Sequence, residues 1–219
     1  MNVLLLGATG MVGQAVLREC LLASDVDRVT ALGRTATGQE HARLEELVHP
    51  NLFELSPIEH TLTGFDACFF CIGVSSAGMS EKQYAHITYD LTLSIARTLT
   101  RLNDRMTFVY VSGAGTYSSE HGRSMWARVK GRTENALLQL PFKAAFMFRP
   151  GAIMPLHGVR SKTALYRAAY FALTPLYPFL KRVAPNVVTT SEQVARAMLQ
   201  VARHGYPNAV LETADINAL

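Results

Sequence analysis

Long apolar runs are absent from this 219-residue sequence. No stretch approaches the ~20 apolar residues that a membrane-spanning helix needs, and the apolar run that opens the chain ends at Gly7, which argues against a secretory leader. Cysteine is also scarce. Three cysteines, an odd number, argue against a disulfide framework and predict a reducing, cytoplasmic location.

Concentrated positive charge is absent as well. The net charge is +4, and the basic residues are scattered without a run of five or more, so no nucleic-acid surface is expected. The seven histidines lack metal-ligand spacing, and no metal site is predicted. Cys68 and Cys71 form a C-x-x-C inside an apparent strand, where their side chains point to opposite faces. They are expected to be core residues.

What the sequence does contain is an alternation of short apolar runs and helical patterns. Strands are predicted at 3–6, 29–32, 52–55, 67–72, 107–111, 145–148 and 208–212. Helices are predicted at 11–23, 43–48, 81–101, 125–140 and 191–203, the last capped by Ser191. Continuous apolar strands separated by helices predict an α/β fold, a doubly wound parallel sheet of strand order 3-2-1-4-5-6-7. Residues 1–219 are predicted to form a single domain.

The connection between the first strand and the first helix is rich in glycine. Its residues are Gly7, Ala8, Thr9, Gly10, Met11, Val12 and Gly13. In a strand–loop–helix context this spacing predicts a dinucleotide site, because the glycines let backbone N–H groups at the helix N-terminus approach a pyrophosphate. The alternative is a tight turn that binds no ligand.

The end of the second predicted strand bears on the choice of cofactor. An acidic residue ~20 residues after the last glycine would bind the ribose hydroxyls of NAD. The sequence there has Arg34 and no acid, and a guanidinium suits a 2′-phosphate. NADP(H) is therefore predicted over NAD(H), the alternative being an ordinary surface arginine.

Further motifs follow in a fixed order. They are LGR at 32–34, FDA at 65–67, VS at 111–112, VKG at 129–131 and FRPG at 148–151. With GATGMVG at 7–13, the sequence resembles the atypical short-chain dehydrogenases/reductases, in particular the Tat-interacting-protein-like and NAD-dependent epimerase-like oxidoreductases. The resemblance covers about residues 2–155 and is looser beyond.

The resemblance implies a catalytic Ser, Tyr and Lys, with the Lys four residues after the Tyr. Ser112 and Lys130 match their places, where Lys binds the nicotinamide ribose and Ser the substrate oxygen. Position 126, however, is Trp. An indole N–H does not titrate and cannot pass a proton as a phenol does.

Three interpretations of the missing tyrosine stay open. Tyr117 or His121, in the loop after the fifth strand, donates the proton instead. Or the reaction needs only hydride transfer, with water as the proton source. Or the chain binds NADPH without catalysis, as a sensor or assembly factor.

The resemblance also implies weaker cofactor contacts. Leu55 and Ser56 would lie near the adenine. The remaining contacts would follow the fourth and sixth strands, at Cys71, Ile72, Gly73, Pro150, Gly151 and Ile153.

The C-terminal third contains an apolar, aromatic segment with basic ends, residues 166–181. It is interpreted as part of a substrate or lid region at about 155–190; the alternatives are weak contact with a membrane surface and a homodimer surface. The sequence thus predicts an NADPH-dependent oxidoreductase acting on a small-molecule substrate, an apolar carbonyl or enone. The alternative is a catalytically silent NADPH-binding regulatory or assembly protein.

Overall fold

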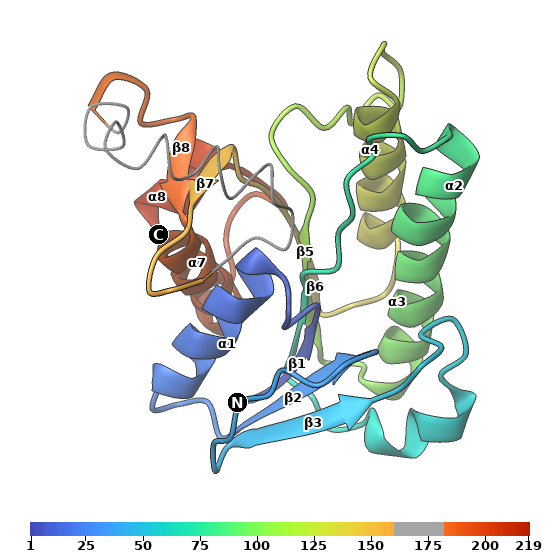
Figure 1. Ribbon diagram of the computed structural model, residues 1–219, viewed down its shortest axis with the longest axis vertical. Helices are drawn as coiled ribbons and strands as arrows, with labels where there is room; N and C mark the ends of the chain where they lie inside the picture. The colour runs from blue at the N-terminus through green and yellow to red at the C-terminus, as the bar shows by residue number, and fades with distance from the viewer. Residues whose placement is uncertain (160–181) are drawn as a thin grey trace.

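At the centre of the computed structural model, which describes residues 1–159 and 182–219, lies a seven-stranded parallel sheet (Figure 1). Its strands are β1 (Asn2–Leu6), β2 (Arg28–Gly33), β3 (Leu44–Val48), β4 (Ala67–Phe70), β5 (Thr107–Val111), β6 (Ala144–Arg149) and β9 (Val210–Glu212). The spatial order is β3-β2-β1-β4-β5-β6-β9. This order confirms the predicted doubly wound α/β fold, with β9 in the seventh place.

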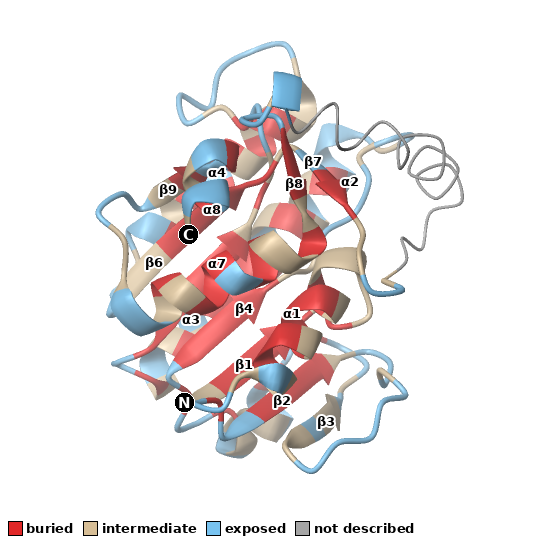
Figure 2. Ribbon diagram, turned by 90° about the vertical axis from the view of Figure 1, so that its left-hand side faces the viewer, coloured by how far each residue is buried: buried red, intermediate tan, exposed pale blue. Residues whose placement is uncertain are grey.

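Helices cover both faces of the sheet. Figure 1 shows α1 (Met11–Leu22), α7 (Ser191–His204) and α8 (Thr213–Ala218) on one side, and α3 (Leu91–Leu102) and α4 (Met125–Leu138) on the other. Each face has its own apolar core because successive strand residues point to opposite faces. Leu5 packs with the α1 and α7 residues, whereas Leu4 packs with those of α3. Figure 2 shows buried β1 and β4 behind α1 and α7.

The strand order reverses between β1 and β4. Leu6 is the last residue of β1 and pairs with Leu32 of β2 on one side and Phe70 of β4 on the other. Parallel strands that leave the sheet in opposite directions open a crevice at their carboxyl ends, where α/β proteins bind ligands.

Two predicted elements between β2 and β4 are wrong. The segment predicted as a helix at 43–48 is strand β3, and the predicted strand at 52–55 is irregular chain that leads into the 3-10 helix η1 (Ser56–Thr61). The sequence Leu-Glu-Glu-Leu-Val is typical of a helix, but these residues form an edge strand whose backbone pairs with β2; Glu45 is exposed and Glu46 is half-buried. Residues 34–43 contain no helix.

The long helix predicted at 81–101 has three parts. These are α2 (Glu81–Ala85), the π-helical turn η2 (His86–Asp90) and α3. The predicted cap of α7 shifts by one residue: the Thr190 hydroxyl accepts from the Gln193 N–H, whereas the Ser191 hydroxyl accepts from Leu156 N–H.

A second, two-stranded parallel sheet lies beside the main one, formed by β7 (Ala152–Met154) and β8 (Val188–Thr190). The aromatic segment at 166–181, and the centre of the predicted lid region, lie outside the described residues. Among the helices that are described, none has the length and apolarity needed to cross a membrane.

We expect Gly13→Ala to destabilise the fold by about 1–3 kcal/mol or more, the usual effect of overpacking. A Cβ at Gly13 would lie 2.1 Å from the carbonyl oxygen of Gly7 and 2.9 Å from Cα of Ala8, and backbone cannot swing aside as a flexible side chain does. Denaturant unfolding measures the effect.

Gly73→Ala is the matched control, because a Cβ there meets no atom within 4 Å. Equal stability of the Gly13→Ala variant and the wild type would contradict the close helix–turn packing described above.

Candidate functional site

The turn from β1 to α1 brings backbone close to backbone. Gly7 has a φ of +82°, and a Cβ on it would lie 2.6 Å from the carbonyl carbon of Cys71. The Gly10 N–H donates to the Gly7 carbonyl at 2.9 Å, which closes the turn. Only glycine accommodates both the left-handed conformation and this approach to the end of β4.

The N-terminus of α1 faces out from this turn. Its N-cap is Gly10, which has no side chain to cap the helix, and its first turn contains no acidic residue. The first N–H groups of a helix lack intrahelical partners and carry the positive end of its dipole. The predicted residues 7–13 therefore form a surface suited to an anion.

The chain after β4 lies directly beside this turn. The Cys71 N–H donates to the Leu6 carbonyl at 2.9 Å, and Ile72 N would lie 2.8 Å from a Cβ on Gly7. Gly73, the next residue, is exposed. The structure thus brings the predicted residues 71–73 together with the glycine turn.

Arg34 lies exposed just after β2. The loop that follows is tied to β3, because both the backbone N–H and the hydroxyl of Thr37 donate to the Glu46 carboxylate. Within residues 1–159 and 182–219, no carboxylate forms an ion pair with Arg34. Its guanidinium is therefore available to a ligand.

Ser112 follows the last residue of β5 and is buried. Its hydroxyl donates to a carboxylate oxygen of Glu134 and also lies 3.0 Å from the Phe148 carbonyl oxygen. Its backbone N–H donates to the same carbonyl at 2.8 Å. A hydroxyl has one proton to give, and here that proton faces protein acceptors.

Lys130 reaches the same place from α4. Its ammonium donates to the backbone carbonyl oxygen of Ser112 and lies 3.9 Å from the point where a Cβ on Gly113 would stand. Burial lowers the pKa of Lys130 from its usual 10.5 to about 8, against the charge of Glu134, which raises it. Trp126 lies one helical turn earlier, with its indole ring 3.7 Å from a Cβ built on Gly115.

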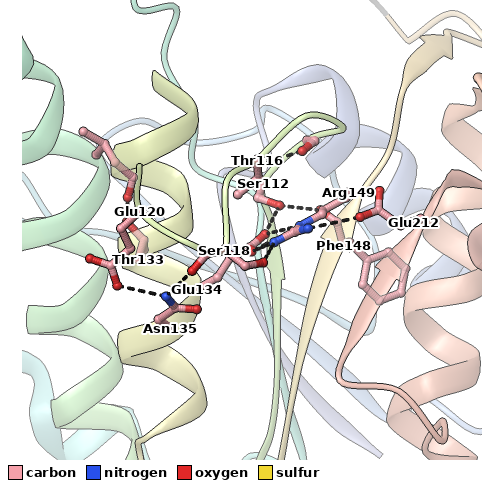
Figure 3. A network of polar contacts seen from close by, with 12 residues as sticks. Ser112, Thr116, Ser118, Glu120, Thr133, Glu134, Asn135, Phe148, Arg149 and Glu212 are labelled. Atoms are coloured by element: carbon pink, nitrogen blue, oxygen red, sulfur yellow. Dashed lines mark hydrogen bonds and ion pairs between the residues drawn. The ribbon is translucent and has the colours of Figure 1, made fainter. Parts of the chain in front are cut away.

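A buried ion pair that was not predicted from the sequence lies beneath Ser112 (Figure 3). Arg149 Nε lies 3.1 and 3.2 Å from the two carboxylate oxygens of Glu134. The other guanidinium nitrogens contact Glu212 at 3.1 Å and the Ser118 hydroxyl at 2.6 Å. One signal was available: Glu134 follows Lys130 by four residues on a predicted helix, which puts both on one face.

The two alternative proton donors lie elsewhere in the loop after β5. The ring of Tyr117 packs on Gly122, where a Cβ would stand 2.3 Å from it, and its carbonyl oxygen packs on Gly131 of α4. His121 is exposed. Among the described residues, neither side chain is hydrogen-bonded to Ser112 or Lys130.

The remaining predicted contacts fall into two places. Leu55 is buried and precedes η1, and the neighbouring Ser56 hydroxyl donates to Glu54. The Pro150 carbonyl accepts from Ala114 N–H at 2.9 Å, and the Gly151 N–H donates to the Thr213 hydroxyl at 2.9 Å. The first bond joins the loops after β5 and β6, and the second joins the loop after β6 to the start of α8.

Ile153 is buried in β7. The carboxyl ends of the parallel strands β1, β4, β5 and β6 lie at the same end of the sheet (Figure 1). There the glycine turn follows β1, Lys130 contacts the Ser112 carbonyl after β5, and residues 150–153 follow β6. Leu55 belongs to a separate segment after β3.

This chain has relatives among known proteins. The chain is 32% identical over 156 residues to "Protein FMP52, mitochondrial" of Eremothecium gossypii, a match that covers 70% of this chain and 67% of that protein. It is 30% identical over 146 residues to "Leucinostatins biosynthesis cluster protein T" of Purpureocillium lilacinum, covering 64% and 52%. The chain thus spans about half to two thirds of these relatives.

Solved structures share the fold. The Bordetella bronchiseptica enzyme WbmF in complex with NAD⁺ superposes with a TM-score of 0.67 at 16% identity, covering 99% of this chain and 76% of that one. The PhqB reductase domain from Penicillium fellutanum gives 0.70 at 16% identity, covering 98% and 67%.

The predicted cytoplasmic location is contradicted by the relatives. FMP52 of Eremothecium gossypii and its counterparts in Emericella nidulans and Aspergillus niger are all named mitochondrial. Cysteine content reports on redox conditions and contains no address for a compartment, so it was a poor basis for that prediction.

The family profile described as "NAD dependent epimerase/dehydratase family" matches residues 3–137, more than half of the chain and the whole stretch from the glycine turn to α4. The chain therefore belongs to the NAD dependent epimerase/dehydratase family, which confirms the resemblance to atypical short-chain dehydrogenases/reductases carried by its motifs.

Proposed function

We propose that this protein is an NADPH-dependent oxidoreductase that reduces the carbonyl or enone group of an apolar small molecule. The observation that carries the proposal is that two groups suited to a dinucleotide lie at the same end of the sheet. The uncapped N-terminus of α1 and the ammonium of Lys130 both lie at the carboxyl ends of the parallel strands.

The cofactor contacts follow from this edge. Residues 7–13 would hold the pyrophosphate through backbone N–H groups, Arg34 the 2′-phosphate, and Lys130 the nicotinamide ribose. The chain after β4 (Cys71, Ile72, Gly73) and the chain after β6 (Pro150, Gly151, Ile153) would flank the cofactor, and Leu55 would lie toward the adenine. When bound, the cofactor supplies the hydride.

The proton for the substrate oxygen needs a separate source, because Trp126 occupies the place of the family's tyrosine. We assign it to Lys130. An ammonium with a pKa of about 8 is matched to proton transfer near neutral pH. The ring of Tyr117 packs on Gly122 instead, and the Ser112 hydroxyl donates to Glu134.

A second candidate function is NADPH binding without turnover, as a regulatory or assembly protein. Trp126 is the observation that favours it, because an indole at this position removes the phenol that the family's reducing site uses.

For the oxidoreductase, the proposal that the substrate is apolar rests on the apolar, aromatic sequence of residues 166–181.

We expect Arg34→Ala to weaken NADPH binding about tenfold to a hundredfold, the range for a lost charge-assisted contact, and to leave NADH binding unchanged. Titration calorimetry with each cofactor measures both affinities.

Arg28→Ala is the control. Arg28 lies at the amino end of β2, whereas Arg34 follows its carboxyl end, and Arg28 pairs with Glu45. If NADPH and NADH bind with equal affinity and Arg34→Ala changes neither, Arg34 does not select the cofactor.

NADPH absorbance over a panel of apolar aldehydes, ketones and enones separates the two candidate functions. We expect turnover of at least one substrate class, abolished by Lys130→Ala and retained by Lys82→Ala, since Lys82 lies exposed on α2. Tight NADPH binding with no turnover on any class would support the silent protein instead.

The lowered pKa of Lys130 predicts a pH-dependent effect on stability. Burying the ammonium destabilises the folded state fully below about pH 8, and this effect disappears as the pH rises toward 10.5, where the unfolded chain also loses the proton. Relative to the wild type, Lys130→Met should therefore be favoured most at pH 7, by an amount that shrinks between pH 8 and 10.5.

Urea unfolding of both proteins across this range measures the difference. Lys82→Met, at an exposed position, should show a constant difference from the wild type. A constant difference for Lys130→Met as well would contradict the buried charge.

A further inference from the structure

Five side chains form a polar cluster below the site, which we call the Arg149 cluster: Ser112, Ser118, Glu134, Arg149 and Glu212. Figure 3 shows the Arg149 guanidinium at its centre, between Glu134 on α4 and Glu212 at the end of β9. Glu134 is 1% exposed and Arg149 8% exposed. A buried ion pair is costly to break, because removing either partner leaves an uncompensated charge.

The cluster determines what the Ser112 hydroxyl can do. A carboxylate is an acceptor only, and the hydroxyl has a single proton to donate. Glu134 Oε1 accepts a hydrogen bond from this hydroxyl, and the Phe148 carbonyl oxygen is the next acceptor, 3.0 Å from the hydroxyl oxygen. Ser112 therefore has no proton left to donate to a substrate oxygen while it bonds Glu134.

The cluster also reaches Lys130. The backbone carbonyl of Ser112 accepts a hydrogen bond from the Lys130 ammonium, while the hydroxyl of the same residue is fixed by Glu134. Lys130 and Glu134 lie four residues apart on one face of α4. Ser112 is thus held at both its side chain and its main chain, and the main-chain contact is the one that locates the ammonium.

We propose that Glu134 and Arg149 are positioning residues, which fix Ser112 so that its carbonyl holds Lys130 toward the nicotinamide ribose. Ser112 then acts through Lys130 and not on the substrate. The inference rests on the proposed function, in which Lys130 binds that ribose. It differs from the family resemblance, which implies that the serine contacts the substrate oxygen.

The test compares two ligands that share one half. NADPH reaches both ends of the site, whereas adenosine 2′,5′-bisphosphate lacks the nicotinamide ribose and depends on Arg34 and the adenosine side alone. We expect Ser112→Ala to weaken NADPH binding about twofold to tenfold, the range for one lost hydrogen bond. Glu134→Gln should weaken it by about tenfold or more, since it also removes the buried carboxylate that pairs with Arg149. Adenosine 2′,5′-bisphosphate should bind both variants like the wild type.

Glu212→Gln is the matched control. Glu212 contacts the same guanidinium but is 52% exposed and does not touch Ser112, so this variant should bind both ligands like the wild type. Thermal unfolding midpoints of all variants accompany the titrations. If Glu134→Gln fails to fold, Ser112→Ala carries the test, because it leaves the ion pair intact.

Two results would overturn the positioning role. One is an equal loss of both ligands in Ser112→Ala and Glu134→Gln, which is the behaviour of a purely structural cluster. The other is unchanged NADPH binding in Ser112→Ala. Failure of the wild type to bind NADPH at all would overturn the proposed function, and the inference with it, before any variant is compared.

Discussion

The architecture of the site depends on a backbone contact between three segments. At the turn after β1, the carbonyl oxygen of Gly7 lies so close to Gly13 that a Cβ on Gly13 would collide with it. Gly7 itself lies against the Cys71–Ile72 peptide. Because Gly7 and Gly13 have no Cβ, α1 can begin directly at the carboxyl ends of β1 and β4. The same contact leaves the first N–H groups of α1 facing the crevice, where the strand order reverses.

A second constraint acts at the other half of the crevice. The Glu134–Arg149 ion pair links α4 to β6, and Arg149 continues to Glu212 at the end of β9. Because the two opposite charges compensate each other, Glu134 and Arg149 can be buried in a region that is otherwise apolar. The two halves thus differ in chemistry: one offers main-chain dipoles suited to phosphate, and the other offers a desolvated ammonium at Lys130. A dinucleotide, anionic at one end and redox-active at the other, matches this division.

How much the sequence could predict depended on whether the signal was local. The glycine turn and the strand at Thr107–Val111 were predicted because spacing and apolar runs within a few residues determine them. Strand β3 was mistaken for a helix because its partly exposed sequence lacks the continuous apolar run of a buried strand. Its pairing with β2 is a tertiary contact that the local sequence does not encode. The Glu134–Arg149 pair was missed for the same reason. Its members lie on different elements, and only the packing of α4 on β6 brings them together.

The proposed function depends on backbone N–H groups at the start of α1 that bind the pyrophosphate of the cofactor. A crystal structure of the protein grown with excess NADPH tests this most directly. We expect pyrophosphate oxygens within about 3 Å of the main-chain nitrogens of Met11 and Val12, with the 2′-phosphate near Arg34. A nucleotide bound at another place, or a glycine turn filled by the protein's own side chains, would contradict it.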